Sequence, residues 1–521
     1  MGMPKSFWLS VAGRCVAAIG LFPSIVFGQQ RSAFQLQETT IAAVHAAFRA
    51  KTLTCRQLVE QYLDRIDRYD KQGPAINAII TINGNALVIA DSLDRHSAQG
   101  GAPGPLHCVP MIVKDNFETV DMPTTGGSLA LEGWRPMQDA TMVARVRAAG
   151  AVILAKSNMA EWAFTPYETV SSILPGYTRN PYALDRVTAG SSGGTAAAIA
   201  ANFGEVGLGT DTGNSIRGPS SHTALVGIRS TMGLTSRAGV IPLNEAADIA
   251  GPMARTVADA VAVLDVVAGS DAADTVTAEA DTRREKDYRA FLVRGSLRGA
   301  RIGILRQAYE RPTLDSEIAA LFDSAVAAMR KQGAIIVDTA QVDSLQAILR
   351  RQRGNCNRFR ADLERYLAER GANAPIKTIA EVLRSRRFHP TVETRLRDAA
   401  QVTELPEQSA ACESRERMRE DLRHAVTAMI DSLGLDALVY PTWSNPPRLT
   451  GDLNTPHGDN SQLFSRTTGF PSITVPMGYS RGKLPAGISF FGKAWSEGRL
   501  IQLAFDFEQA TRHRRAPAAV P

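Results

Sequence analysis

The sequence predicts an α/β fold: a single large domain with a central mixed, mainly parallel β-sheet covered by helices on both faces, plus a helical insertion. Three observations support this prediction. Strand-like and helix-like patterns alternate along most of the chain. Several of the strands are continuous apolar runs, such as Ala151–Lys156, which is typical of strands buried on both faces. Within the 521 residues, no internal repeat and no Pro/Gly/Ser-rich linker marks a second domain.

The first half of the chain supplies most of these alternating elements. Apolar residues at helical spacing predict helices, and short apolar runs predict strands. The expected helices and strands, in chain order, are Thr39–Asp70 (helical), Pro74–Ile82 (strand), Asn85–His96 (helix), Pro105–Val113 leading to Lys114 (strand), Thr141–Ala149 (helix), Ala151–Lys156 (strand), Thr195–Ala201 (helix), Val206–Gly209 (strand) and Arg255–Val267 (helix).

The second half continues the alternation around one interruption. Residues 338–430 are rich in Arg and Glu and mostly helical in pattern, so we expect an insertion or cap over the α/β core. The elements expected on either side are the strand Ala300–Leu305, the helix Ser316–Gln332, the strand Ala334–Val337, the strands Asp436–Pro441, Pro471–Val475 and Gly487–Phe491, and the helix Arg499–Gln509.

Composition and charge exclude several classes of protein. The chain is 44% hydrophobic and 21% charged, which is ordinary for a globular protein and argues against disorder throughout. The formal net charge is +6, small for this length, and the basic residues form no stripe interleaved with aromatics. Nucleic acid is therefore not expected as a partner.

The N-terminus has the pattern of a secretory signal. Lys5 and Arg14 precede the apolar stretch Cys15–Phe27, and Gly28 supplies a small residue at its end. We expect a signal peptide over residues 1–28, cleaved after Gly28, and a periplasmic or secreted mature domain over residues 29–521. The apolar stretch is too short to span a bilayer, so no stable membrane insertion is expected after its removal. An amphipathic start is the alternative.

Five cysteines are present, and Cys15 would be removed with the signal. The four that remain are too few for a disulfide scaffold in a chain of this length. Cys356 and Cys412 can pair in an oxidising compartment or stay as free buried thiols, and the sequence does not decide between these states. The absence of CxxC and HExxH patterns gives no support to a metal site, and we expect no metal and no cofactor.

The stretch from Thr188 to Pro219 carries the strongest chemical pattern. It contains two Gly/Ser-rich turns, with Ser191 in the first and Ser215 in the second. A serine hydroxyl needs a base to become a nucleophile, and none of the eight histidines has a recognisable triad context. Lys114 ends an apolar run, and a lysine that burial keeps neutral can take a proton. The pattern indicates serine chemistry that uses lysine as the base.

The turn around Ser215 also has the backbone for binding an oxyanion. Successive N–H groups of Thr212, Gly213, Asn214 and Ser215 can converge on one oxygen, with Gly213 allowing unusual dihedral angles. Asp211 is expected to brace this turn. An alternative nucleophile is Ser192, because Gly190–Gly194 fits the GxSxG pattern of α/β-hydrolases, which would also need a histidine such as His457 or His513.

Several long segments resemble the amidase signature family. They include PLHCVPMIVKDN around Lys114 and GSSGGTAAAIAANFGEVGLGTDTGNSIRGPSSHTALVGIRSTMGL around both serines. Further similar segments are Ala151–Phe164, Gly251–Asp259, Asp436–Thr442 and the region from Gly469 to Thr511. The segments are in the family's order and spacing, and the resemblance covers nearly the whole mature chain.

The resemblance implies a hydrolase of linear carboxylic amides, with esters and carbamates as further substrates. It implies that Ser215 is the acyl nucleophile, that Ser191 is a bridging serine held by a cis peptide, and that Lys114 is the base. It further implies a backbone oxyanion hole over residues 212–215, a small-molecule amide as substrate and, because dimers occur in the family, a homodimer as one assembly state.

Two residues depart from the family pattern. Asn214 stands where the family usually has a second glycine before the nucleophile, and we expect Asn to tolerate a left-handed conformation there and to change the acyl pocket or add a hydrogen bond. His222 stands where an apolar or aromatic residue is common. Two other functions remain open: the glutamine-hydrolysing subunit of a tRNA-dependent amidotransferase, and a non-catalytic paralogue that binds amides.

Overall fold

The computed structural model describes residues 9–10 and 34–521, and residues Gln35–Pro521 form one compact unit. The predicted signal peptide therefore lies outside the described residues, apart from Leu9 and Ser10. Among the residues that are described, no helix combines the length and apolar character needed to cross a membrane.

An eleven-stranded sheet forms the centre of this unit, in the order β1-β3-β2-β6-β8-β7-β12-β13-β11-β9-β10. The strands, in chain order, are β1 Ile79–Ile82, β2 Pro110–Lys114, β3 Val152–Ser157, β6 Val206–Asp211, β7 Val226–Arg229, β8 Ile249–Ala254, β9 Arg301–Ile304, β10 Ile335–Val337, β11 Ala437–Pro441, β12 Ser472–Ser480 and β13 Leu484–Phe491. A separate hairpin pairs β4 (Arg179–Asn180) with β5 (Ala183–Val187).

The predicted α/β fold with one mixed sheet is confirmed. Parallel pairing occurs in two blocks, β3-β2-β6 and β11-β9-β10. The strands between these blocks pair antiparallel, and two of them, β7 and β8, were not predicted. Their sequences, VGIR and IAGPMA, are short and contain glycine or proline, so neither shows the apolar run that marks the other buried strands.

Small residues let two helices pack directly on one face of the sheet. A side chain on Gly207 would collide with Thr195 of α5 (Gly193–Ala200), and one on Gly227 would collide with Ser220 of α6 (Arg217–His222). Side chains alternate across a strand, so Val206 and Leu208 face the opposite side and join the main apolar core.

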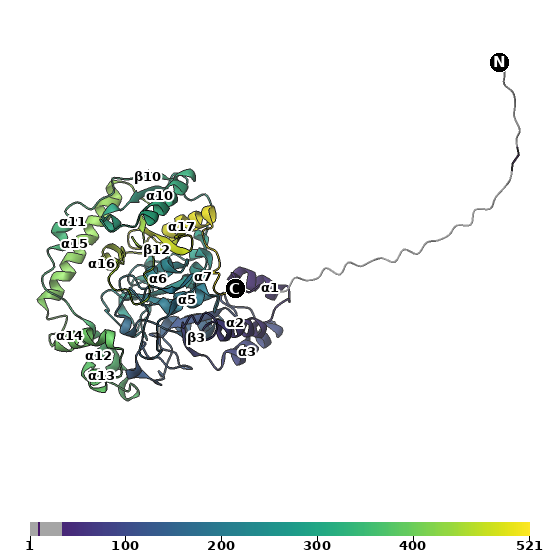
Figure 1. The fold of residues 1–521 in the computed structure, drawn as a ribbon, viewed down its shortest axis with the longest axis horizontal. Helices are drawn as coiled ribbons and strands as arrows, with labels where there is room; N and C mark the ends of the chain where they lie inside the picture. The colour runs from purple at the N-terminus through teal and green to yellow at the C-terminus, as the bar shows by residue number, and fades with distance from the viewer. Residues whose placement is uncertain (1–8, 11–33) are drawn as a thin grey trace, which may run out of the picture. The chain divides into compact units, whose positions relative to one another are not determined.

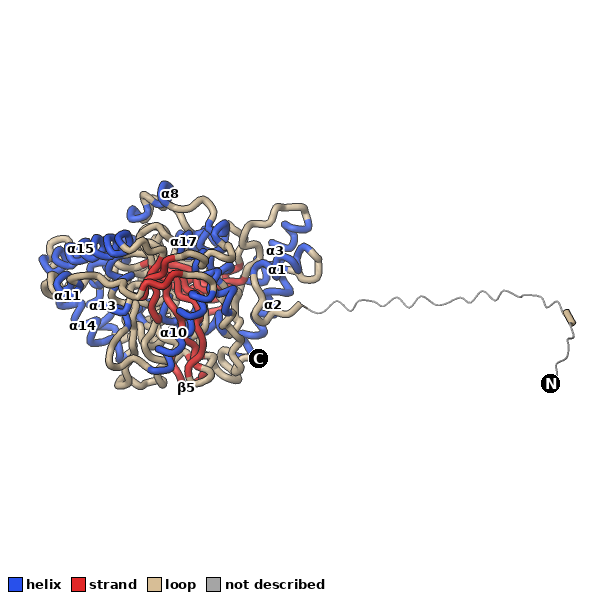
Figure 2. The backbone as a smooth tube through the Cα atoms, turned by 90° about the horizontal axis from the view of Figure 1, so that it is seen from above, coloured by secondary structure: helices blue, strands red, loops and turns tan. Residues whose placement is uncertain are grey.

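Larger helices cover that opposite face, where α7 contacts both α4 and α17, and α17 contacts α10. Figure 2 shows the strands in red between the helices. This layer consists of α4 Thr141–Ala148, α7 Val257–Val267, α10 Ser316–Lys331 and α17 Glu497–Thr511. The two layers confirm the prediction that helices cover both faces of the sheet.

Two helices, α1 (Ile41–Arg49) and α2 (Cys55–Tyr69), precede the first strand of the sheet, and α3 (Ala86–Ala98) follows it. The long helix expected over Thr39–Asp70 is divided in two, because Thr54 caps α2 and shares a capping box with Gln57. A disulfide joins Cys55, at the start of α2, to Cys108, just before β2. The sequence analysis did not predict this pair.

Between β10 and β11 the chain is helical. Figure 1 shows these helices as a green arc that stands beside the sheet. They are α11 Leu345–Leu349, α12 Phe359–Glu369, α13 Ile379–Ser385, α14 Glu393–Gln401 and α15 Ala410–Ser432. Apolar residues of α12, α13 and α14 form a second cluster with Trp134, Trp162 and Phe164 from the N-terminal half. The arc is thus anchored on the half of the chain that carries Lys114 and both serines.

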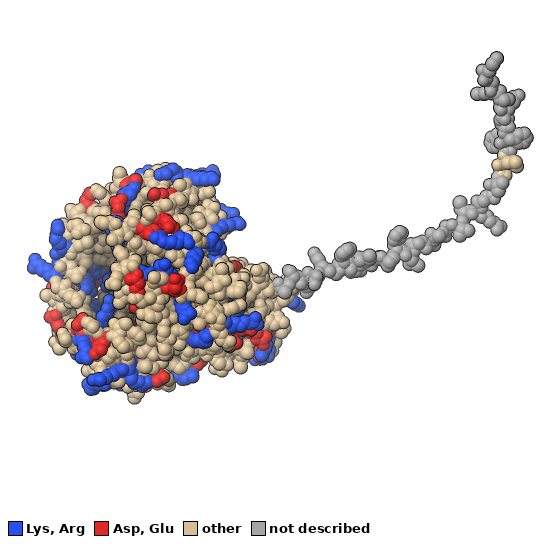
Figure 3. Space-filling model, viewed as in Figure 1, with Lys and Arg blue, Asp and Glu red and all other residues tan. Residues whose placement is uncertain are grey.

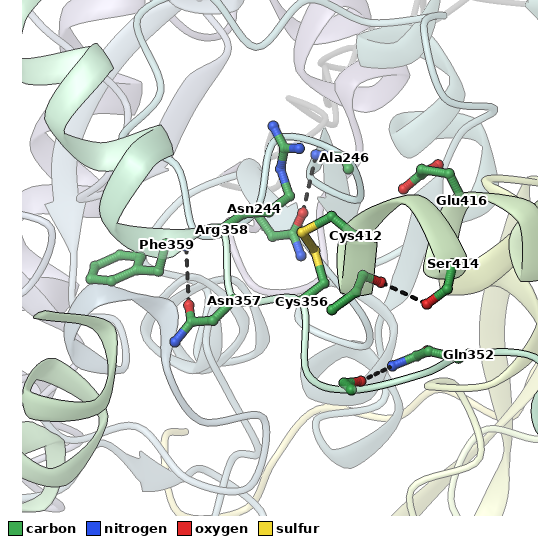
Figure 4. The surroundings of a disulfide bond; sticks show 12 residues. Asn244, Ala246, Gln352, Cys356, Asn357, Arg358, Phe359, Cys412, Ser414 and Glu416 are labelled. Atoms are coloured by element: carbon green, nitrogen blue, oxygen red, sulfur yellow. Dashed lines mark hydrogen bonds between the residues drawn. A yellow bond between two sulfur atoms is a disulfide. The ribbon is translucent and has the colours of Figure 1, made fainter. Parts of the chain in front are cut away.

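A disulfide joins the segment between α11 and α12 to the start of α15. Cys356, in the segment before α12, bonds to Cys412 in the first turn of α15, so the paired state of the two alternatives is the one found. Figure 4 shows this bond with Asn244 and Arg358 close by.

Candidate functional site

The candidate site lies where β2 and β6 end side by side. The two strands are parallel neighbours, so their carboxyl ends meet at one edge of the sheet. Lys114 is the last residue of β2 and Asp211 the last of β6. The loop that precedes α5 brings Ser191 to this edge, and the loop that precedes α6 brings Ser215. The structure therefore gathers the predicted lysine and both predicted serines.

Lys114 is fully buried, and its ammonium group is held by hydroxyls. Nζ donates to Ser191 Oγ at 2.7 Å and to Thr210 Oγ1 at 2.7 Å. Burial lowers the pKa of Lys114 to about 7, and the nearby charges of Asp248 and Asp211 oppose this effect. A lysine with this pKa is neutral in about half of the molecules at neutral pH and can then accept a proton.

Ser191 follows a cis peptide bond between Gly190 and Ser191. Only glycine fits before it, because a Cβ on Gly190 would lie 2.7 Å from the backbone oxygen of Thr165 and would also collide with that of Glu168. The Ser191 carbonyl accepts a hydrogen bond from Ala160 N at 3.1 Å. These contacts hold the Ser191 hydroxyl against the lysine.

Ser192 has a different environment from its neighbour. Its hydroxyl donates to Thr210 O at 3.2 Å and accepts from Thr210 N at 3.3 Å, and its own N–H donates to Ser215 O at 3.3 Å. Ser192 therefore ties together the loops that carry the two other serines. No histidine ring bonds to it within residues 34–521, so it lacks the base that a nucleophile elbow requires.

The Ser215 loop presents free backbone donors. Within the part of the chain that the structure describes, the N–H groups of residues 212–215 make no hydrogen bond, whereas those of Ile216 and Arg217 donate to Asp211. Ser215 is 5% exposed, so little of this residue contacts solvent. Four unpaired donors beside a serine can stabilise a negative oxygen.

Two expectations about this loop need correction. Neither Gly213 nor Asn214 has a positive φ, so no left-handed conformation is needed. A Cβ on Gly213 would collide with Gln462 Oε1, so a side chain at this position requires the end of Gln462 to move. The Asn214 side chain is buried against Gly218 and makes no hydrogen bond within the described residues, so it adds none to the loop.

Asp211 braces the loop through two buried arginines. Its carboxylate pairs with Arg217 Nε at 3.1 Å and with Arg229 Nη1 at 3.1 Å. Burial on its own raises the pKa of Asp211, but the charges of Arg217 and Arg229 outweigh it and lower the pKa to about 2. The carboxylate therefore stays ionised and keeps the backbone of Ile216 and Arg217 in place.

Several contributing residues were not predicted. Asn116 Nδ2 donates to Thr210 Oγ1 at 3.1 Å, and Asp248 accepts a hydrogen bond from Thr212 Oγ1 at 2.5 Å. Asp248 comes from a loop before β8 and carries no sequence signal that would link it to the serines. Arg217 follows Ser215 by two residues, so its pairing with Asp211 is the one contact that the local sequence could have indicated.

His222 is not a candidate base. Its ring stacks on Trp443 with centroids 4.5 Å apart, and neither ring nitrogen has a hydrogen-bond partner among the described residues. Burial lowers its pKa to about 3, so the ring is neutral. Over the same residues, no group of three or more His, Cys, Asp or Glu side chains is placed to hold a metal ion.

A cavity of about 400 Å³ opens beside Thr212. One wall comes from the helical arc, through residues 355–359 and parts of α14 and α15, and the other from Leu243, Asn244 and Arg466. This volume is within the range of small-molecule sites. Of the residues that carry the free donors, Thr212 lines this space, so the Ser215 loop reaches the cavity through Thr212.

Comparison with known proteins identifies the family. The amidase family model matches residues 57–501. A probable amidase of Arabidopsis thaliana is 35% identical over 507 residues, covering 93% of this chain and 92% of the relative. A glutamyl-tRNA(Gln) amidotransferase subunit of Moorella thermoacetica is 33% identical over 485 residues, covering 90% of this chain and 96% of the relative.

Among solved structures, native peptide amidase from Stenotrophomonas maltophilia is similar with a TM-score of 0.83 and 37% identity, covering 93% of this chain and 99% of that chain. The fold, the matched region and these relatives agree with the resemblance found in the sequence. The chain belongs to the amidase signature family of amide-hydrolysing enzymes.

Proposed function

We propose that this protein hydrolyses carboxylic amides through a seryl acyl-enzyme, with Ser215 as nucleophile, Ser191 as proton relay and Lys114 as base. The observation that carries the proposal is the 2.7 Å contact from Lys114 Nζ to Ser191 Oγ in a fully buried site. The unpaired N–H groups of residues 212–215 support the same assignment, because amide attack generates a negative oxygen that needs such donors.

Acylation begins with neutral Lys114, which takes the hydroxyl proton of Ser191 while Ser191 takes that of Ser215. Ser215 Oγ then bonds to the amide carbon, and the carbonyl oxygen becomes an oxyanion facing the free N–H groups. When the C–N bond breaks, Ser191 gives a proton to the leaving nitrogen and recovers one from the Lys114 ammonium. The products of this half are an acyl-Ser215 ester and a free amine or ammonia.

Deacylation uses the same three residues, with water in place of Ser215 as the group that loses a proton to Ser191. A water molecule loses a proton to Ser191, which passes one to Lys114, and the resulting hydroxide oxygen bonds to the acyl carbon. The bond from carbon to Ser215 Oγ then breaks, and Ser215 recovers its proton from Ser191. A carboxylic acid leaves, and Lys114 is neutral again.

The decisive experiment measures hydrolysis of aryl and alkyl amides and matching esters by the wild type and Ser215→Ala. We expect kcat/KM to fall by about 10³-fold or more in the variant. A fluorophosphonate probe should label the wild type at Ser215, as located by peptide mass spectrometry. Labelling at Ser192, or full activity of Ser215→Ala, would contradict the assignment. Wild-type binding of amides without turnover would favour a non-catalytic paralogue.

The similarity to one component of an amidotransferase keeps that function as the second candidate. Such a component hydrolyses glutamine for a partner complex, whereas the proposed enzyme acts alone. Purification of the native protein from its source cells separates the two: partner proteins that co-purify, with glutamine as the preferred amide, would support the second candidate. A stable monomer or homodimer active on other amides supports the first.

We further propose that the enzyme works outside the cytosol, in the periplasm or the medium. Support comes from the leader-like pattern of residues 1–28 and from the two disulfides, which are typical of oxidising compartments. Mass spectrometry of the mature N-terminus in fractionated cells tests this. A cytosolic protein that retains Met1 would refute it.

A further inference from the structure

Arginines from separate segments line the cavity beside Thr212. Arg395 lies on α14, Arg415 on α15 and Arg466 on α16 (Phe464–Thr468), and Arg358 stands just before α12. Figure 3 shows a hollow bordered by basic side chains on the side where Figure 1 places α14 and α15. The fold thus collects positive charge at one place from segments that are far apart in the sequence.

Three of these arginines have no ionic partner. Arg358 pairs with Asp362 at 3.0 Å, but within residues 34–521 no carboxylate forms a salt bridge with Arg395, Arg415 or Arg466. Most other arginines of the arc are paired, for example Arg397 with Glu393 at 2.6 Å. Asp398 is the single acidic residue on the cavity wall among the described residues. The cavity therefore carries a net positive charge that the protein itself does not neutralise.

The like charges are also close enough to affect one another. Partial burial, followed by the positive charge of Arg466, lowers the pKa of Arg415, and Arg466 acts in the same direction on the pKa of Arg395. Holding such groups together without a counter-charge costs free energy. An anion that bridges them would remove this cost, and planar guanidinium groups are well suited to carboxylates.

The cluster is adjacent to the reacting groups. Arg466 Cδ lies 3.1 Å from the position that a Cβ on Gly213 would occupy, and Arg466 Nη1 donates to Gln462 Oε1 at 3.1 Å. A second cavity of about 210 Å³ shares Asn244, Arg415 and Arg466 with the first. Arg466 therefore lies beside the loop that carries Ser215, and Arg395 and Arg415 line the same cavity as Arg466.

We propose that the preferred substrates are amides that carry one or more carboxylates, bound by Arg395, Arg415 and Arg466. This inference rests on the proposed function. The arginines act as specificity residues, because they hold the anionic part of the substrate while Ser215 attacks its amide. Neutral amides of the same size are poorer substrates, and cationic ones are the poorest.

The test compares matched p-nitroanilides with glutaryl, pentanoyl and 5-aminopentanoyl groups, which differ only in the charge at the far end. A second arm places the carboxylate on the amine side, with pentanoyl-4-aminobenzoate against pentanoyl anilide. We expect the acidic member of at least one arm to have a kcat/KM at least about tenfold above the neutral one. The arm that responds tells which side of the amide faces the arginines.

Three variants locate the effect: Arg395→Gln, Arg415→Gln and Arg466→Gln. Each should lower kcat/KM for the preferred acidic substrate by about tenfold, mainly through KM, with little change for the neutral one. Two matched controls lie on the same helices but pair with neighbours at the surface: Arg397→Gln on α14 and Arg417→Gln on α15. They should leave the acidic-to-neutral ratio unchanged.

Binding to Ser215→Ala separates this inference from the proposed function. In the arm that responds, calorimetry should show tighter binding of the acidic amide than of the neutral one, with the difference lost in the double variant Ser215→Ala/Arg415→Gln. Equal binding and equal turnover across both arms would overturn the inference while leaving amide hydrolysis intact. Preferential binding of the acidic ligand without any turnover by the wild type would overturn the proposed function and retain the anion site.

Discussion

The reaction centre and the helical arc place charge in opposite ways. At the centre, the buried Asp211 is neutralised by Arg217 and Arg229, and Lys114, which has no salt bridge among the described residues, has its pKa lowered to about 7. Along the arc, Arg415 faces a cavity with no ionic partner among the described residues. The paired charge of Asp211 holds the backbone of its loop in place, whereas the unpaired charge of Arg415 is available to bind an anion. We propose that the first region carries out the reaction and that the second selects substrates.

The largest effect should come from removing the base. Lys114→Met keeps much of the side-chain volume but loses the amine, so we expect kcat/KM to fall by about 10³-fold for acidic and neutral amides alike. Lys493, which pairs with Asp431 and is partly exposed, supplies the control as Lys493→Met, with activity unchanged. A loss of kcat/KM confined to acidic substrates would show that Lys114 helps to select the substrate, and would contradict its role as the base.

A smaller loss is expected from Gly213→Ala. The added methyl collides with Gln462 Oε1, so either Gln462 or the N–H donors must shift, and we expect a decrease in kcat of up to about 10²-fold for all substrates. The double variant with Gln462→Ala removes the obstacle and should recover part of that activity. No recovery would mean that the glycine is needed for another reason. Asn214→Ala, whose side chain makes no hydrogen bond within the described residues, should change kcat far less.

The dependence of kcat/KM on pH tests whether Lys114 acts as the base. Protonated Lys114 cannot accept a proton, so kcat/KM should rise about tenfold per pH unit below about pH 7 and level off above it. The charge of Asp248 stabilises the ammonium form and so raises the pKa of Lys114, and Asp248→Asn should therefore move the midpoint to lower pH. The exposed control Asp323→Asn should not move it. A midpoint that moves upward would show that the sign of this coupling is wrong.

The smallest expected change in activity comes from loss of a disulfide, and only one of the two disulfides should affect substrate preference. They close loops of similar sequence separation, 56 for Cys356–Cys412 and 53 for Cys55–Cys108, so loss of either should reduce stability by a similar amount, about 4 kcal/mol in the chain-entropy account. The double serine variant at 356 and 412 should also weaken the preference for acidic amides a few-fold, because it frees the segments that carry Arg358 and Arg415. Loss of the preference for acidic amides in the variant Cys55→Ser/Cys108→Ser would contradict this expectation. Thermal unfolding and the acidic-to-neutral kcat/KM ratio measure both effects.

The difference between the reaction centre and the helical arc also explains which residues could be predicted from the sequence. Lys114, Ser191 and Ser215 stand in apolar or glycine-rich segments whose local pattern carries their chemistry, so they were predicted and lie together as expected. Strands β7 and β8 were missed because their few residues lack an apolar run, and their antiparallel pairing depends on distant partners.

The arginine cluster could not have been predicted in the same way. Arg395 and Arg415 lie in ordinary charged helices, where their neighbours Arg397 and Arg417 look identical in sequence, and Arg466 lies in a five-residue helix with no other charge. Only the fold shows which of them face the cavity and lack a carboxylate. Asp248 is similar, because nothing near it in the chain indicates that it reaches Thr212.

The tight packing of α5 and α6 on the glycines of the sheet has a consequence for how this enzyme can change. At Gly207, Gly227 and Gly487 even one added methyl would collide with a side chain of those helices. Substitutions in the sheet under α5 and α6 therefore cannot change the shape of the reaction centre without disturbing these helices. New substrate ranges arise more readily among the residues that line the cavity, most of which lie in the arc between β10 and β11. Exchange of that segment among related enzymes is therefore the route by which evolution, or a protein engineer, can alter selectivity while the relay stays intact.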